Sequence, residues 1–93
     1  MMIKRQATSE GKVKITFSLP LEVAPDPTSV TGDFNDWNPL VTPMKKRSNG
    51  TRSASVEMPA GSTACFKYLS HGGTWFTDHS IDVDDEGNNT LIA

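Results

Sequence analysis

The chain is poor in the residues that several common chemistries require. Its 93 residues include a single cysteine, Cys65, so we expect no internal disulfide and no cysteine-based metal site. No apolar run is long enough to cross a bilayer, and no apolar segment follows the charged start MMIKRQ as it would in a signal peptide. The 9 basic residues are outnumbered by 11 acidic ones, and no basic cluster exceeds Lys45-Lys46-Arg47. These absences predict a cytoplasmic protein that uses neither nucleic acid nor a membrane as partner.

Helical periodicity is missing as well, and alternation with a period of two takes its place. Residues 12–19 alternate strictly between polar and apolar side chains, which is typical of a half-buried strand. Further strands are expected at 29–31, 42–46, 53–58, 64–70, 74–77 and 90–93, separated by Gly, Pro and Asn turns. The sequence therefore predicts an all-β sandwich of about seven short strands, formed by one domain over residues 12–93 behind an N-terminal tail, residues 1–11. The expected core comprises Val13, Ile15, Phe17, Val56, Met58, Phe66 and Tyr68.

The segment VTGDFNDWNP, residues 30–39, ends a strand in a turn that carries an aromatic ring. Trp37 is surrounded in sequence by short polar side chains: Asp33, Asn35, Asp36 and Asn38. A flat ring can cover the apolar face of a pyranose, while such neighbours can bond its hydroxyls. The alternative is that Trp37 folds back to close one end of the core, and the segment by itself does not decide between the two.

A second segment, FKYLSHGGTWF, places another tryptophan after a strand. Phe66 and Tyr68 alternate with Lys67, so if the two rings face the core, Lys67 points outward beside the turn that carries Trp75. A lysine offers three donors to a hydroxyl or a ring oxygen, although an exposed strand lysine taken singly more often has no special role.

These motifs, in this order, resemble carbohydrate-binding module family 48. The resemblance rests on VTGDFNDW, MPAG, FKYL, TWFTD and GNN, and it runs from about Lys12 to Ile92. The family includes the glycogen-binding domain of the AMP-activated protein kinase β subunit and the early-set N-terminal domains of isoamylases and branching enzymes. The resemblance implies an immunoglobulin-like (early-set) sandwich that binds α-1,4-glucan of the glycogen or starch type.

The resemblance also implies which residues bind the sugar. Trp37 and Trp75 match the two tryptophans that stack on consecutive glucose units, Lys67 matches the strand lysine, and Asn88 matches an asparagine of the late loop. The loop itself departs from the family, because residues 84–87 read DDEG where an aliphatic residue and a threonine are typical. Carboxylates cannot replace that apolar packing, so we expect weak binding.

Other functions find less support in the sequence. Residues 82–87 begin like a calcium loop, but position twelve would be Ala93 instead of a bidentate glutamate. Asp33, Asp36 and Asp78 lie in turns, with no cleft to hold two carboxylates across a glycosidic bond. We therefore expect no catalytic residues, no metal and no cofactor. The alternative to sugar binding is an early-set interaction or regulatory module that docks a glycogen- or starch-metabolising enzyme through an edge strand.

Overall fold

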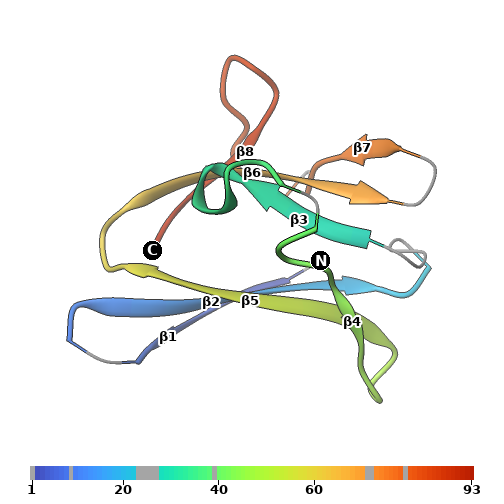
Figure 1. Cartoon of the computed structure of the whole chain (residues 1–93), viewed down its shortest axis with the longest axis horizontal. Coiled ribbons are helices and arrows are strands. Elements are labelled where there is room, and N and C mark those ends of the chain that lie inside the picture. The colour runs from blue at the N-terminus through green and yellow to red at the C-terminus, as the bar shows by residue number, and fades with distance from the viewer. Residues whose placement is uncertain (1, 9, 23–27, 39, 71–72, 79) are drawn as a thin grey trace.

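Two antiparallel sheets lie face to face in the computed structural model, which describes residues 2–8, 10–22, 28–38, 40–70, 73–78 and 80–93 (Figure 1). The first, called sheet A, has the order β1 (Met2–Ala7), β2 (Lys12–Pro20), β5 (Thr51–Pro59) and β4 (Lys45–Lys46). The second, called sheet B, has β3 (Thr28–Gly32), β6 (Thr63–Ser70) and β7 (Thr74–Phe76), with β8 (Asn89–Ile92) also pairing with β6. The predicted all-β sandwich is confirmed. Among the described residues, no helix is long and apolar enough to cross a membrane.

The core lies between the sheets and is built on the alternation that the sequence shows. Phe17 of β2 contacts Phe66 of β6 edge-to-face, with ring centroids 4.9 Å apart, and Tyr68 packs at right angles to both. Of the expected core residues, five are buried and two, Val13 and Val56, are partly buried against the cluster. The buried apolar set also includes Leu19, Val30, Met44, Ala54, Ala64 and Leu91.

One side of the sandwich is closed by a segment that passes from one sheet to the other. The backbone of 42–44 bonds to β3, through Val30 N–H to the Thr42 carbonyl and Met44 N–H to the Thr28 carbonyl. Residues 45–46 then pair with β5 in sheet A. The expected strand at 42–46 is thus divided between two sheets, which is how Pro43 is accommodated without interrupting a ladder.

The opposite side is bordered by β1, a strand that the sequence did not predict. Residues 1–11 were expected to be a tail, but β1 pairs with β2 along its whole length. Its inward positions are Ile3, Arg5 and Ala7, since these pair with Phe17, Ile15 and Val13, respectively. A charged residue at the central inward position breaks the apolar pattern, and this explains why the strand was missed.

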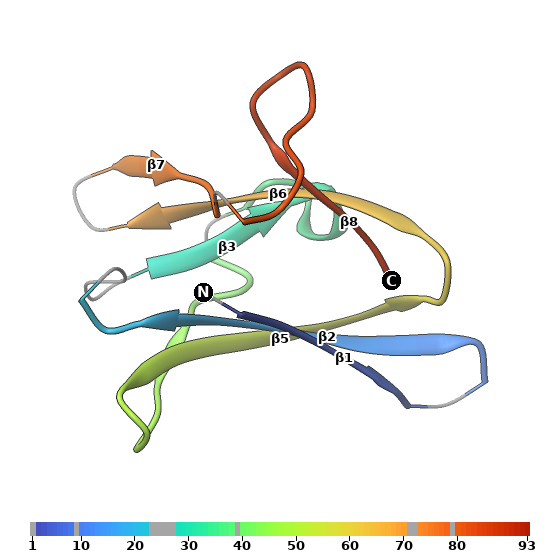
Figure 2. The same ribbon diagram turned by 180° about the vertical axis from the view of Figure 1, so that it is seen from behind.

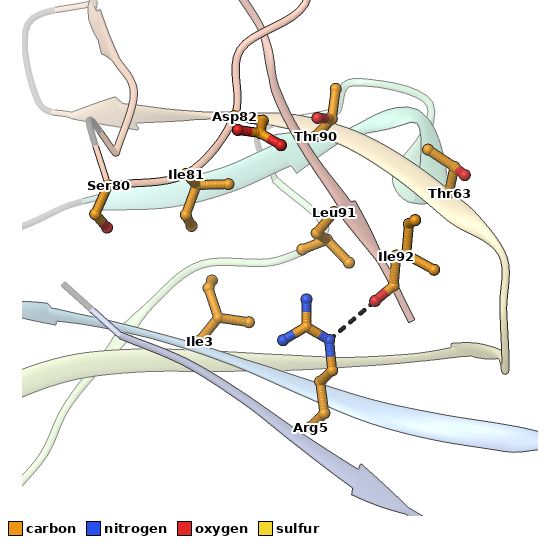
Figure 3. Close-up of a pocket in the computed structure, with 9 residues that line it drawn as sticks. All are labelled: Ile3, Arg5, Thr63, Ser80, Ile81, Asp82, Thr90, Leu91 and Ile92. Atoms are coloured by element: carbon orange, nitrogen blue, oxygen red, sulfur yellow. Dashed lines mark hydrogen bonds between the residues drawn. The ribbon is translucent and has the colours of Figure 1, made fainter.

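Arg5 spans the gap between the two sheets on this side (Figure 3). Its Nε donates to the carbonyl of Ile92 in β8 over 2.9 Å, and it lies among Ile3, Ile81 and Leu91 in a groove of about 500 Å³. An inward-pointing charge is one way in which proteins protect a sheet edge from pairing with another chain. The groove contains no aromatic side chain among its lining residues.

Two of the expected loops lie mostly outside the described residues: the proline-rich connection, at 23–27, and the turn after β6, at 71–72. The loop before β8, at 82–88, rises from sheet B away from sheet A, as both views show (Figures 1 and 2).

Candidate functional site

An open pocket on sheet B gathers all four residues that the sequence singled out. It has a volume of about 460 Å³ and is lined by Trp37, Lys67, Trp75, Asn88 and Glu86. These side chains come from four separate parts of the chain: the turn after β3, β6, β7 and the loop before β8. Neither tryptophan belongs to the core, because Trp37 is 37% exposed and Trp75 is 49% exposed.

Strand register places two of the lining residues. Phe66 and Tyr68 of β6 face the core, so Lys67 lies on the outer face of sheet B. Trp75 of β7 pairs with Leu69 of β6 and therefore points to the same outer face. The alternation along β6 thus places Phe66 and Tyr68 in the core and Lys67 on the outer face of sheet B, which it shares with Trp75.

Trp37 is placed by a turn that Asn35 holds together. The Asn35 side chain accepts from Gly32 N–H at 3.0 Å and donates to the Val30 carbonyl and to Thr42 Oγ1, each at 3.0 Å. Trp37 N–H closes the turn on the Gly32 carbonyl at 2.8 Å. Position 32 requires glycine, because an added Cβ would stand 2.5 Å from the Cys65 carbonyl oxygen.

The polar neighbours of Trp37 are used largely inside the chain. Asn35 is occupied as described, Asp33 Oδ1 accepts from Cys65 N–H at 3.3 Å, and Asn38 Oδ1 accepts from Leu40 N–H at 2.9 Å. Three of these groups therefore shape the turn, and the expectation that they also bond sugar hydroxyls stays a prediction. The polar side chains that line the pocket itself are those of Lys67, Glu86 and Asn88.

The turn also holds two successive residues in the left-handed region. Asp36 has φ 55° and Trp37 has φ 58°, and they are the only residues besides glycines with positive φ in the described part of the chain. A residue with a Cβ pays about 1–2 kcal/mol to adopt this conformation. The turn with these two unfavourable φ angles places the Trp37 ring in the lining of the pocket.

We expect Trp37→Gly to be more stable than Trp37→Ala by about 1 kcal/mol, because both remove the ring but only alanine keeps the left-handed penalty. Urea unfolding of the two variants measures the difference. The matched control is Ser55→Gly against Ser55→Ala, at an exposed strand position without positive φ, where alanine should be the more stable. If alanine were also favoured at position 37, the turn would not have the geometry described here.

The loop before β8 is organised by Asp84. Its Oδ1 accepts from the backbone N–H of Glu86 at 2.9 Å and of Asn88 at 3.0 Å, which fixes the two residues that the loop contributes to the pocket. The bond from Asn88 N–H is the main reason that the pKa of Asp84 lies below its usual value, and the Glu86 N–H acts in the same direction. The loop also meets the strand lysine, because Lys67 Nζ lies 4.0 Å from where a Cβ on Gly87 would stand.

The two adjacent asparagines of this loop have different roles. Asn88 lines the pocket, whereas Asn89 is fully buried. Asn89 Oδ1 accepts from Asp78 N–H at 2.7 Å, and its Nδ2 donates to the carbonyls of Asp78, Ile81 and Asp82. Asn89 therefore holds the base of the loop, and the residue that sequence reasoning missed on the pocket side is Glu86.

Three carboxylates act on Cys65, which precedes Lys67 by two residues in β6. Cys65 is partly buried, and its pKa is raised first by that burial and then by the charges of Asp33, Asp84 and Glu86. The Lys67 ammonium acts in the opposite sense, because it helps to lower the pKa of Asp84. No group of three or more His, Cys, Asp or Glu side chains among the described residues is arranged to hold a metal ion.

The arrangement as a whole consists of two exposed rings, one ammonium, one carboxylate and one amide around an open hollow. Such a surface can stack on flat apolar faces and exchange hydrogen bonds with hydroxyls at the same time. No protein-family model matches the chain, and no curated protein matches it either.

Proposed function

We propose that the chain is a non-catalytic carbohydrate-binding module, of the immunoglobulin-like early-set type, that recognises α-1,4-glucan on sheet B. The observation that carries this proposal is the shared pocket of Trp37, Trp75, Lys67 and Asn88, four residues far apart in the sequence. Core formation does not require these residues to meet, because the two rings are exposed and Lys67 faces outward. A surface that brings exposed tryptophans together beside hydrogen-bonding groups is suited to a ligand with apolar faces and hydroxyl edges.

Each residue has a role that follows from its chemistry. Trp37 and Trp75 stack on pyranose rings, and Lys67 and Asn88 donate to hydroxyl or ring oxygens. Glu86 accepts hydrogen bonds from a pair of sugar hydroxyls. In carbohydrate-binding module family 48, the corresponding loop supplies an apolar contact instead. No step of bond cleavage is assigned to this surface, since the described residues that line it include a single carboxylate, Glu86, where glycoside hydrolysis uses two.

A two-ring platform without an apolar clamp is expected to bind weakly. Each stack contributes about 0.5–1.5 kcal/mol beyond the area that it buries, which places the dissociation constant on the order of 0.1–1 mM. Such an affinity suits a polymer that offers many sites in a row, because repeated engagement raises the overall binding. The companion of the module is then an enzyme of glycogen or starch metabolism in the cytoplasm.

The sugar specificity provides the test of this proposal. Maltoheptaose or β-cyclodextrin should change the emission of the protein, whose only two tryptophans both line the pocket. Cellohexaose should produce a much smaller change, because a straight β-1,4 chain cannot follow a platform suited to a curved one. Retardation in a native gel that contains glycogen is the independent measurement. An equal response to both sugars, or free migration through glycogen, would contradict the proposal.

A further inference from the structure

The fold separates the charges of the chain between its two sheets. Of the 9 basic residues, eight lie on or next to the strands of sheet A, and only Lys67 lies on sheet B. The loops on the outer side of sheet B carry Asp33, Asp36, Asp84, Asp85 and Glu86. The two sheets are stacked across the intermediate axis of the molecule, along which it measures 34 Å (Figure 1), whereas charges in physiological salt are screened over about 8 Å. A partner therefore meets each face separately, and the net charge of -2 describes neither of them.

Strand register shows which cations share the outer face of sheet A. Ile15 and Phe17 of β2 point inward, so Lys14 points outward, and in β1 Lys4 points outward with it. Lys45 pairs with Ser53, which itself pairs with the outward Ser18 of β2. Arg47 reaches the same side, because its Nε donates to Ser53 Oγ at 2.7 Å. Lys12 completes the set, and Glu57 is the only carboxylate that the strands of this face present.

Three of these cations surround a hollow of about 500 Å³. Lys14, Lys45 and Arg47 line it together with Val41, Pro43 and the short side chains of β5, and no acidic residue is among the lining residues. Glu57 stands opposite Lys14 in the ladder, but its ion pair is with Lys12, at 3.8 Å. That is the one ion pair within the described part of the chain. Within the part of the chain that the structure describes, none of the three cations around the hollow has an ion-pair partner.

We propose that this basic face of sheet A docks an acidic segment of a partner protein, with Lys14, Lys45 and Arg47 binding its carboxylates. The hollow between them is lined by Val41, which is exposed, and by Pro43, so it can also take an aliphatic side chain of the same segment. Arg47 is already oriented by Ser53, and a guanidinium held in place binds a carboxylate with less loss of freedom. The surface lies on the sheet opposite to the proposed glucan site, so the module can bind both ligands at once.

A protein segment fits this face better than a nucleic acid does. Single-stranded nucleic acids bind through aromatic side chains on which bases stack, and the residues that line this hollow include no aromatic ring. Duplex recognition needs an element that enters a groove, whereas this face is a sheet whose outward residues are mostly Ser, Thr and Lys. A local patch of charge with an apolar pocket is the typical complement of a short acidic and aliphatic sequence.

The probe for the experiment is a fluorescein-labelled peptide of alternating glutamate and valine, whose binding is followed by fluorescence anisotropy. Lys14→Glu/Lys45→Glu should weaken binding about tenfold or more in about 0.15 M salt, since two attractions become repulsions. The matched control is Lys4→Glu/Lys12→Glu, which makes the same change of charge on the same face outside the hollow and should weaken binding less than about threefold. All four lysines are exposed, and each double variant places one new carboxylate beside Glu57, so both should lower the melting temperature slightly and by a similar amount.

Several outcomes would overturn the proposal. No binding of the peptide even in about 0.01 M salt would remove the surface as a docking site. If both double variants lost the same amount of affinity for the peptide, the peptide would be attracted by the overall charge of the face and not bound at a defined site. A DNA duplex or vesicles containing phosphatidylserine that bind more tightly than the peptide, with loss in the Lys14→Glu/Lys45→Glu variant, would assign the face to those partners instead. Self-association of the protein alone in low salt, abolished by that variant, would make a second copy the occupant.

Discussion

Replacement of Phe66 by alanine is expected to remove about 3–5 kcal/mol of stability, which is most of what a domain of this size has. Phe66 is fully buried and contacts Phe17 and Tyr68 edge-to-face, with centroid distances of 4.9 Å and 5.7 Å. Its loss opens a cavity between the two sheets that neighbouring strands cannot close without breaking their ladders. Urea unfolding followed by circular dichroism measures the change.

A matched control separates this effect from the loss of an apolar side chain in general. Leu40 is 86% exposed, so Leu40→Ala should change the unfolding free energy by no more than about 0.5 kcal/mol. If Phe66→Ala lowered the melting temperature by only a degree or two, Phe66 would not lie at the centre of the core.

Replacement of Trp75 by alanine should abolish detectable glucan binding while leaving the fold intact. The ring is 49% exposed and contributes to sheet B mainly through its cross-strand neighbour Leu69, a kind of contact that contributes about 0.2–1 kcal/mol. The loss of stability should therefore be about 1 kcal/mol or less. Binding should fall much further, because one of the two stacking surfaces is gone. Migration in native gels with and without glycogen, beside urea unfolding, measures the two effects separately.

Val83 provides the control for this variant. It has the same exposed fraction as Trp75, 49%, and lies in the loop before β8 but not among the lining residues of the pocket. Val83→Ala should keep both stability and retardation by glycogen. A folded Trp75→Ala variant that glycogen still retards normally would show that the sugar binds elsewhere.

The sequence predicts the strands in which inward positions are apolar and outward positions are mostly polar. The alternation at 12–19 and in β6 indicates the two central strands, because the large apolar side chains there, apart from Leu69, face the core. β1 escapes prediction because Arg5 occupies an inward position and bonds the Ile92 carbonyl across the sandwich. The division of residues 42–46 between the two sheets also depends on contacts with β3 and β5, which are distant in sequence.

The candidate site was predictable in its rings and less so in its polar groups. Trp37 and Trp75 are conspicuous in the sequence, and the structure brings them to one pocket. Asparagines are ambiguous, because the same amide can face a ligand or bond the backbone. Asn35 and Asn89 do the latter, and only the three-dimensional partners of each show it. Glu86 enters the pocket through the turn that Asp84 holds, which no spacing rule foretells.

The left-handed turn at Asp36 and Trp37 has a consequence for engineering. If codons 36 and 37 were randomised and the pool were selected only for survival of heating, glycine should accumulate at both positions, because it relieves the backbone at φ 55° and φ 58°. The survivors would lose the ring at the mouth of the pocket. A selection scheme for a heat-resistant form of this domain must therefore keep a binding step in every round, since at this one turn durability and recognition favour different residues.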